Sequence, residues 1–324
     1  MKKRPLVVLT GPTAVGKTKA SISLAKAIGG EIISADSMQV YKYMDIGSAK
    51  IRPEEMHGIP HHLVDELLPS EEFNVVRFQE MAKKAVEHIY GRDRIPVVVG
   101  GTGFYIQALL YDIDFAENGT GSDIRDRLAG YAHRHGAEKL HERLAEVDEA
   151  SAARIHPNNV KRVIRALEFY EQTGQKISEH NERERAKESP YNAVYFVLTD
   201  DRGHLYARID GRVDKMIEDG LVDEVRGLKK MGYTKEMVSM QGLGYKEILD
   251  YLDGRCTLEE AVYTIKRDTR HFAKRQITWF KREKNVIWID KKTYGYDEEE
   301  MVHAMIKHLE GVLCLEDFSG GTSS

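Results

Sequence analysis

The stretch GPTAVGKT, residues 11–18, decides the fold of this chain. It fits the phosphate-loop pattern G-x-x-x-x-G-K-[ST] in full. The apolar run PLVVLT at 5–10 predicts a buried β-strand before it, and the residues after Lys17 predict a helix that ends at Gly29 and Gly30. Between a strand and a helix, the backbone N–H groups of such a loop and the helix dipole point at phosphate oxygens. A chance match within an ordinary loop, the alternative, would lack this setting. The stretch therefore predicts a binding site for a diphosphate or triphosphate.

The residues of this stretch, which we call the phosphate loop, have separate expected roles. Gly11 and Gly16 let the backbone curl around the phosphates, and Lys17 supplies a mobile cation. The Thr18 hydroxyl is a suitable ligand for Mg²⁺, which we expect as the cofactor. The expected phosphate-binding residues are therefore Gly11, Pro12, Thr13, Ala14, Val15, Gly16, Lys17 and Thr18.

Composition is typical of a protein with a sizeable core. The chain has 324 residues, of which 41% are hydrophobic and 31% charged, and its formal net charge is −4. No apolar run approaches the roughly 20 residues that a membrane span needs, and the N-terminal apolar run is too short for a signal peptide. Cys256 and Cys314 give neither a disulfide framework nor zinc spacing. We therefore expect a cytoplasmic monomer with no membrane partner.

The first third of the chain alternates strand and helix patterns. Apolar strand candidates at 6–10, 31–34 and 96–99 are separated by helical stretches such as 75–90. This order predicts an α/β fold like that of P-loop NTPases, with a parallel sheet flanked by helices.

The rest of the chain predicts a helical insertion and a return to the sheet. Residues 123–185 are densely charged and helical in pattern, with no convincing strand. Strand patterns return at 193–199 and 286–289, with helices over 203–285 and 298–310. The expected organisation is a catalytic core at 1–112 and 191–315, a mostly helical inserted domain at 113–190, and a disordered tail at 316–324.

Polar residues follow two of these strands, at the edge that lines the ligand crevice of an open α/β sheet. Asp36 is a candidate general base or metal ligand there, or else Asp36 or Ser37 simply caps the next segment. The residues 100–103 (GGTG) form a second glycine-rich turn, in which the Thr102 hydroxyl could contact a phosphate or a substrate amine. An ordinary tight strand-to-helix turn is the alternative.

The stretch KRDTRHFAKRQITWFKREK at 266–284 is basic, with eight Lys or Arg against two acids. Cations beside Phe272, Trp279 and Phe280 are a combination that binds RNA. The alternative, which the pattern alone favours, is an amphipathic helix with a solvated basic face and its aromatics in the core.

Two further pairs of cations stand at i, i+4 spacing. Lys161 and Arg165 share one helical face, and Arg208 and Arg212 share another that suits a diphosphate clamp. Ion pairs with nearby acids are the slightly favoured alternative for the second pair: Asp210, Asp214 and Glu218.

The histidines of HGIPHH, at 57, 61 and 62, have no acidic or Cys partner at ligand spacing. We therefore expect no metal site from them, and Asp65 could instead orient one of the rings.

Seven motifs in order make the chain similar to a known family, the bacterial tRNA dimethylallyltransferases (tRNA isopentenyltransferases). The resemblance runs from about residue 6 to about residue 290. The motifs are GPTAVGKT at 11–18, ISADSMQVY at 33–41, VVGGTGFY at 98–105, KRVIRALE at 161–168, RIDGRVDKM at 208–216, QGLGYKE at 241–247 and KRQITWFK at 274–281.

The resemblance implies a prenyl transfer to RNA. Dimethylallyl diphosphate donates its five-carbon group to N6 of the adenosine immediately 3′ of the anticodon, and diphosphate is released. By resemblance, Asp36 is the general base, Thr102 contacts the adenosine or bridges to the diphosphate, and Lys17, Thr18 and Arg212 hold the diphosphate with Mg²⁺. The residues expected to contact the anticodon stem-loop are Asp36, Ser37, Met38, Gln39, Thr102, Arg125, Lys161, Arg162, Val163, Ile164, Arg165, Gln241, Gly242, Leu243, Gly244, Tyr245, Lys246, Lys274, Arg275, Gln276, Trp279 and Lys281.

Two other functions share part of the sequence evidence. A small-molecule kinase that uses ATP would explain the phosphate loop, Asp36 and the glycine turns, but not the basic stretch at 266–284. An RNA-binding protein switched by a nucleotide would explain the basic stretch, but would need no base at Asp36.

Overall fold

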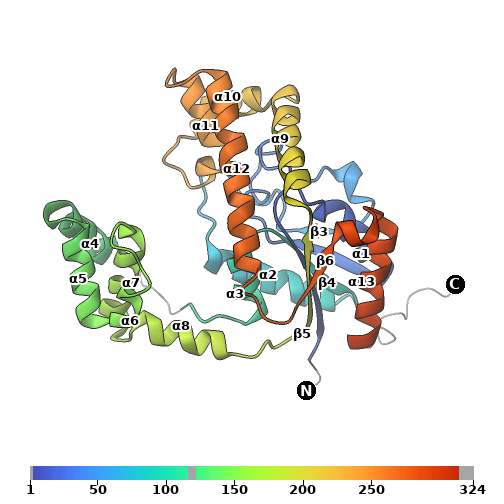
Figure 1. The fold of residues 1–324 in the computed structure, drawn as a ribbon, viewed down its shortest axis with the longest axis horizontal. Helices are drawn as coiled ribbons and strands as arrows, with labels where there is room; N and C mark the ends of the chain where they lie inside the picture. Colours follow the sequence, from blue (N-terminus) through green and yellow to red (C-terminus); the bar gives the residue numbers. More distant parts are fainter. Residues whose placement is uncertain (1–2, 116–121, 314–324) are drawn as a thin grey trace. The chain divides into compact units, whose positions relative to one another are not determined.

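The structure, a computed structural model, describes residues 3–115 and 122–313, so the expected tail at 316–324 lies outside the described residues. The chain separates into two compact units, which Figure 1 shows. Unit 1 comprises Met1–Leu110 and Pro190–Ser324, and unit 2 comprises Tyr111–Ser189.

Unit 1 is built on a six-stranded sheet with the order β3-β2-β4-β1-β5-β6, in which every pair of neighbours is parallel. This confirms the predicted α/β fold with a parallel sheet. The strands are β1 (Pro5–Thr10), β2 (Gly30–Ser34), β3 (His61–His62), β4 (Ile95–Gly100), β5 (Asn192–Thr199) and β6 (Val286–Asp290). The sequence did not indicate β3, because two histidines at the sheet edge form no apolar run.

Helices flank this sheet because the strands are apolar toward both faces. Val7 and Leu9 of β1 share a buried cluster with residues of α1 and α13, while Leu6 and Val8, also fully buried, alternate to the other face. Figure 1 shows α1 and α13 together on one side of the strands. The helices of unit 1 are α1 (Lys17–Ile28), α2 (Val75–Tyr90), α3 (Gly103–Leu110), α9 (Arg202–Glu218), α10 (Leu221–Lys230), α11 (Tyr245–Leu252), α12 (Leu258–Phe280) and α13 (Glu298–Val312), with 3₁₀ turns η1 (Pro53–Met56), η2 (Ser239–Gln241) and η3 (Lys291–Tyr294).

Among its described residues, unit 2 contains helices and no strand. Its helices are α4 (Ser122–His135), α5 (Ala137–Val147), α6 (Glu149–Ala152), α7 (Val160–Thr173) and α8 (Ile177–Ala186). Leu128, Leu140 and Leu144 form a separate core with Val163 and Leu167, so the unit has a hydrophobic cluster of its own.

A single carboxylate joins two of these helices. Asp148 is 1% exposed and accepts four hydrogen bonds, from the backbone N and the hydroxyl of both Ser151 and Ser178, at 2.7–3.0 Å. One side chain therefore caps α6 and also binds the first turn of α8.

None of the helices in the described part of the chain combines the length and the apolar character that spanning a bilayer requires.

Candidate active site

The parallel register brings the predicted polar turns to one edge of the sheet. Thr10 of β1 pairs with Gly100 of β4, and the Thr10 hydroxyl donates to the Gly100 carbonyl at 2.6 Å. The turn after β2 is tied to the same place, because Ala35 N donates to Val99 O at 2.8 Å and Thr102 N donates to Ala35 O at 3.3 Å. The phosphate loop, Asp36 and Thr102 therefore follow three neighbouring strands.

Two glycines allow the backbones to approach this closely. Gly11 has φ +148°, and a Cβ there would lie 2.5 Å from the Leu198 carbonyl oxygen. At Gly100 a Cβ would lie 2.2 Å from the Ala35 carbonyl oxygen. A side chain at either position would collide with backbone, so both glycines are required by space, and Gly11 also by its backbone conformation.

Gln276 of α12 bridges the two glycine-rich turns. Its Oε1 accepts from Thr13 N at 2.8 Å, and its Nε2 donates to Gly101 O at 2.9 Å. This amide is buried and uses both ends within the protein, so Gln276 has a structural role; its predicted contact with RNA stays a prediction.

The site is electropositive. The Lys17 ammonium donates to the Gly11 and Pro12 carbonyls at 2.9 Å each. The pKa of Lys17 is lowered to about 8, chiefly by burial. The charge of Asp36 opposes this shift, and the charge of Arg212 adds to it. Burial, followed by the charge of Arg208, also lowers the pKa of Arg212. Cations crowded around one carboxylate form a site suited to a polyanion.

The position of Asp36 is compatible with both roles considered from the sequence, a capping residue and a general base. Its Oδ1 accepts from Met38 N at 2.8 Å and from Gln39 N at 3.4 Å, which is the capping role. Among the described residues, no hydrogen bond reaches its Oδ2. One oxygen therefore fixes the side chain while the other remains able to accept a proton.

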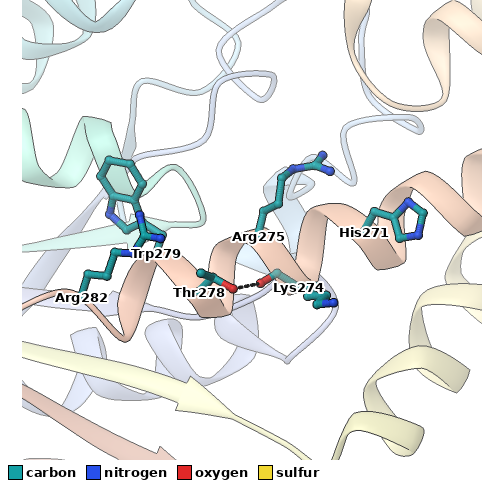
Figure 2. A pocket seen from close by; sticks show the side chains of 6 residues that line it. All are labelled: His271, Lys274, Arg275, Thr278, Trp279 and Arg282. Carbon is teal, nitrogen blue, oxygen red and sulfur yellow. Dashed lines mark hydrogen bonds between the residues drawn. The ribbon is translucent and has the colours of Figure 1, made fainter. Parts of the chain in front are cut away.

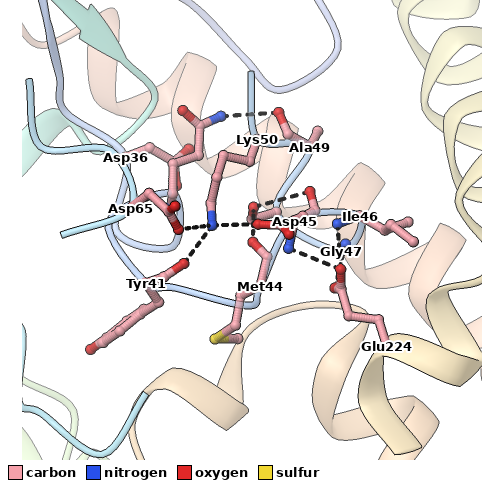
Figure 3. A network of polar contacts seen from close by, with 12 residues as sticks. Asp36, Tyr41, Met44, Asp45, Ile46, Gly47, Ala49, Lys50, Asp65 and Glu224 are labelled. Carbon is pink, nitrogen blue, oxygen red and sulfur yellow. Dashed lines mark hydrogen bonds and ion pairs between the residues drawn. The ribbon is translucent and has the colours of Figure 1, made fainter. Parts of the chain in front are cut away.

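A polar network secures the segment that follows Asp36, as Figure 3 shows. The buried Lys50 ammonium donates to Tyr41 O at 2.6 Å and to the carboxylates of Asp45 and Asp65 at 2.6 and 2.9 Å. Gln39 Nε2 donates to Ala49 O at 3.2 Å. The predicted RNA contact Gln39 therefore uses its amide to hold the loop.

Glu224 of α10 holds the other end of this loop. Its carboxylate accepts from the backbone N of Asp45, Ile46 and Gly47 at 2.7–3.2 Å. It also accepts from the Tyr245 hydroxyl at 2.8 Å. Tyr245 is 0% exposed, so its side chain packs in the core; its predicted contact with RNA stays a prediction.

The remaining residues of the 241–246 segment lie beside the Asp36 turn. A Cβ on Gly242 would come within 2.5 Å of the Met38 methyl carbon, so these two predicted RNA contacts are neighbours. Gly244 is buried at the start of α11, Leu243 and Lys246 are half-buried, and Gln241 is exposed. Ser37 and Thr102 are half-buried as well.

Asp210 and Asp214 pair with cations of α12, and among the described residues Arg208 and Arg212 form no ion pair, in contrast to the alternative that we favoured slightly. Arg270 NH1 lies 2.5 Å from Asp210 Oδ1. Asp214 likewise pairs with a cation of α12, at 2.6 Å. Arg208 instead donates from Nε to Ala14 O at 2.8 Å. Asp210 and Asp214 of α9 thus pair with α12, and Arg208 contacts the phosphate loop.

Lys291 is a site residue that the sequence analysis missed. Its ammonium donates to Val15 O at 3.2 Å in the phosphate loop. The available signal was its place directly after the last predicted strand, at 286–289, where the rule applied to Asp36 would have selected it.

The phosphate loop fits a magnesium ion bound mainly through phosphate and water. Among the described residues there is no group of three or more His, Cys, Asp or Glu side chains able to hold a metal. Mg²⁺ bound with phosphates needs only one or two protein oxygens, and the Thr18 hydroxyl is exposed beside the loop.

His61 and His62 form the edge strand β3 of the sheet. His62 Nε2 lies 2.9 Å from Glu31 Oε2. Asp65, which we considered as the partner of one ring, instead binds Lys50.

The basic stretch is divided between packing and an exposed surface. Phe280 is fully buried, which agrees with the amphipathic interpretation, whereas Trp279 is half-buried. Figure 2 shows a pocket of about 480 Å³ along α12. Its lining residues are His271, Lys274, Arg275, Thr278, Trp279 and Arg282. Lys281 is exposed on the same helix.

In unit 2, some of the predicted RNA contacts are exposed and others are buried. Arg125 and Arg165 both pair with Glu168, at 2.9 and 3.5 Å, and remain 60% and 40% exposed. Val163 and Ile164 are buried in the core of the unit, where their side chains pack; their predicted contacts with RNA stay predictions. The neighbouring Lys161 and Arg162 are exposed.

Comparison with known proteins gives consistent matches over nearly the whole chain. A family model described as IPP transferase matches residues 39–283. The tRNA dimethylallyltransferase of Lachnoclostridium phytofermentans is 62% identical over 294 residues, which cover 91% of this chain and 94% of that protein. The tRNA dimethylallyltransferase of Alkaliphilus oremlandii is 48% identical, covering 96% of this chain and 98% of that protein.

Solved structures share the fold. The tRNA isopentenylpyrophosphate transferase of Bacillus halodurans matches with a TM-score of 0.71 and 45% identity, over 97% of this chain and 99% of that one. A eukaryotic dimethylallyltransferase acting on tRNA matches with a TM-score of 0.77 and 32% identity, over 89% of this chain and 74% of that one.

Proposed function

The chain belongs to the IPP transferase family of tRNA dimethylallyltransferases, and we propose how its own residues perform that transfer. The donor is dimethylallyl diphosphate, and the acceptor is N6 of the adenosine immediately 3′ of the anticodon. The N6–C1 bond forms as the C1–O bond to diphosphate breaks, and diphosphate leaves with the electron pair. One proton must leave N6.

Asp36 takes that proton in this proposal. The observation that carries it is the placement of Asp36, fixed through Oδ1 at the sheet edge that bears the phosphate loop, with Oδ2 unbonded among the described residues. Adenine N6 is a poor nucleophile because its lone pair is delocalised into the ring. A base positioned to accept the proton as the bond forms offsets that weakness.

The leaving diphosphate is held by the electropositive site. Negative charge grows on its oxygens as the C1–O bond breaks, and Lys17, Arg212 and the loop N–H groups stabilise that charge. Mg²⁺ bound through the Thr18 hydroxyl would supply further positive charge there. Thr102, which follows β4 at the same edge, is placed to contact the adenosine or the diphosphate.

The RNA is bound by exposed cations in both units. Lys274, Arg275 and Lys281 of α12 and Lys161 and Arg162 of α7 are exposed side chains suited to phosphate oxygens. The half-buried Trp279, in the pocket of Figure 2, offers an aromatic face on which an unpaired base can stack. The target base must leave its stack to reach Asp36.

The test supplies the protein with Mg²⁺, labelled dimethylallyl diphosphate and unmodified tRNA, with labelled ATP as the competing donor. Label on an adenine of the anticodon loop is the expected result. Transfer of phosphate from ATP, without prenyl transfer, would contradict the proposal.

Asp36→Asn tests the base. Asparagine retains an oxygen for the Met38 and Gln39 amides but is not a base, so we expect the transfer rate to fall by about 10²-fold or more. Affinities for tRNA and diphosphate should stay within a few-fold. Asp93→Asn, the same substitution at an exposed position outside the site, is the matched control. A normal rate in Asp36→Asn would remove Asp36 from the mechanism.

A further inference from the structure

The carbonyls of the phosphate loop are held by cations from three different elements. Lys17 donates to Gly11 O and Pro12 O, at the beginning of the loop. Arg208 of α9 donates to Ala14 O at 2.8 Å, and Lys291, which begins η3 after β6, donates to Val15 O at 3.2 Å.

Peptide planarity converts these contacts into a direction for the N–H groups. In a trans peptide the C=O and the following N–H lie in one rigid plane and point in opposite directions. Lys291 holds the plane shared by Val15 and Gly16, and Arg208 holds the plane shared by Ala14 and Val15. The N–H of Gly16 therefore points away from Lys291 and, among the described residues, donates to no protein group.

The backbone between these two contacts needs external support. Ala14 has φ +63°, in the left-handed region that non-glycine residues rarely adopt. The hydrogen bond within the loop, from Val15 N to Pro12 O, is long at 3.4 Å. Gly16 adds little stiffness, since its φ is +102° and it has no side chain. Charged donors from outside the loop are thus the strongest contacts on this part of it.

We propose that Lys291, assisted by Arg208, is a positioning residue that holds the phosphate loop with the Gly16 N–H turned toward the diphosphate. The inference rests on the proposed function in taking diphosphate as the ligand. The Lys291 ammonium lies 3.2 Å, and Arg208 NH2 3.7 Å, from where a Cβ of Gly16 would stand, so both cations flank the same residue. Burial and the charge of Arg208 lower the pKa of Lys291, as expected for cations gathered where an anion binds.

Lys291→Met tests this role, with Lys292→Met as the matched control because Lys292 is the exposed next residue of η3. We expect the Kd of inorganic diphosphate, measured by calorimetry, and the KM of dimethylallyl diphosphate to rise about tenfold in Lys291→Met. The KM of tRNA should stay within twofold. Arg208→Met should change the same constants in the same direction.

Hydrogen exchange separates positioning from direct contact with the anion. Without any diphosphate, a peptide covering residues 13–17 should exchange faster in Lys291→Met than in wild type, and Lys291→Arg should restore slow exchange. Unchanged diphosphate affinity would overturn the proposal. Weaker affinity with unchanged exchange would also overturn it, because Lys291 would then act only on the bound anion. These measurements need no RNA, so failure of prenyl transfer by the wild-type protein would contradict the proposed function separately.

Discussion

At the residue scale, the charge of Lys17 determines how donor binding responds to pH. Its pKa in the folded protein is lowered from 10.5 to about 8, chiefly by burial. The ammonium is therefore present below about pH 8 and is lost as pH rises above it, while a bound diphosphate would raise the pKa and retain the proton. We expect kcat/KM for dimethylallyl diphosphate to fall above about pH 8, and kcat at saturating donor to persist to higher pH.

A pH series of both constants, with tRNA saturating, checks this expectation. A flat kcat/KM between pH 7 and pH 10 would contradict it. The same lowered pKa also affects stability, but stability rises with pH where donor binding weakens. Between about pH 8 and 10.5 the unfolded chain binds the Lys17 proton and the folded chain does not, so this group increases stability as pH rises through that window.

Individual residues were predictable where a motif coincided with the end of a strand. Asp36 and Thr102 were selected in that way, and the register places their turns beside the phosphate loop. Gln276 was placed on the RNA surface because a motif does not reveal which side of a helix is buried. Lys291 was missed because its contact with Val15 depends on β5 lying between β1 and β6, which is a property of the strand order.

At the scale of elements, α12 divides its cations between α9 and solvent. Lys266 and Arg270 pair with Asp214 and Asp210 of α9, whereas Lys274 and Lys281 are exposed and form no ion pair with the described residues. Sequence spacing placed Lys274 and Lys281 on one row, but it did not show that Arg270 belongs to a packed interface. The sequence predicted a helix over this stretch, but it did not show which face of the helix packs against the rest of the protein.

The double variant Lys274→Gln/Lys281→Gln tests the exposed row of α12. We expect a several-fold higher KM for tRNA and a smaller salt dependence, by about 0.7–0.9 in log–log slope for each RNA phosphate that is no longer neutralised. The melting temperature should not change. Arg270→Gln is the contrasting variant, because removal of the Asp210 partner should lower stability. Unchanged tRNA binding at all salt concentrations in the double variant would show that this row does not contact RNA.

At the scale of the whole molecule, the two units have separate hydrophobic clusters. Sequence patterns indicated both units, because a run of charged helical sequence without strands interrupts an α/β pattern. What they did not indicate is the residue that organises the smaller unit. Asp148 looks like an ordinary charged residue, yet it accepts four hydrogen bonds from Ser151 and Ser178.

Asp148→Ala should destabilise unit 2 and spare the site in unit 1. Loss of two capping interactions and of buried partners predicts a cost of about 2–4 kcal/mol in the free energy of unfolding. We expect tRNA affinity to fall while the Kd of diphosphate stays within twofold. Glu149→Ala, at the exposed neighbouring position, is the control. A parallel loss of diphosphate binding would show that the units do not fold independently.

The contacts of the phosphate loop also have a consequence for protein synthesis. The loop is complete at residue 18, but Arg208, Gln276 and Lys291 hold its backbone. At translation rates of about 5–20 residues per second, roughly 15–55 s separate the loop from Lys291 on the ribosome. A nascent or prematurely terminated chain therefore contains the motif but lacks the side chains that hold its backbone. Tight binding of the prenyl diphosphate is then expected only after Lys291 has been translated.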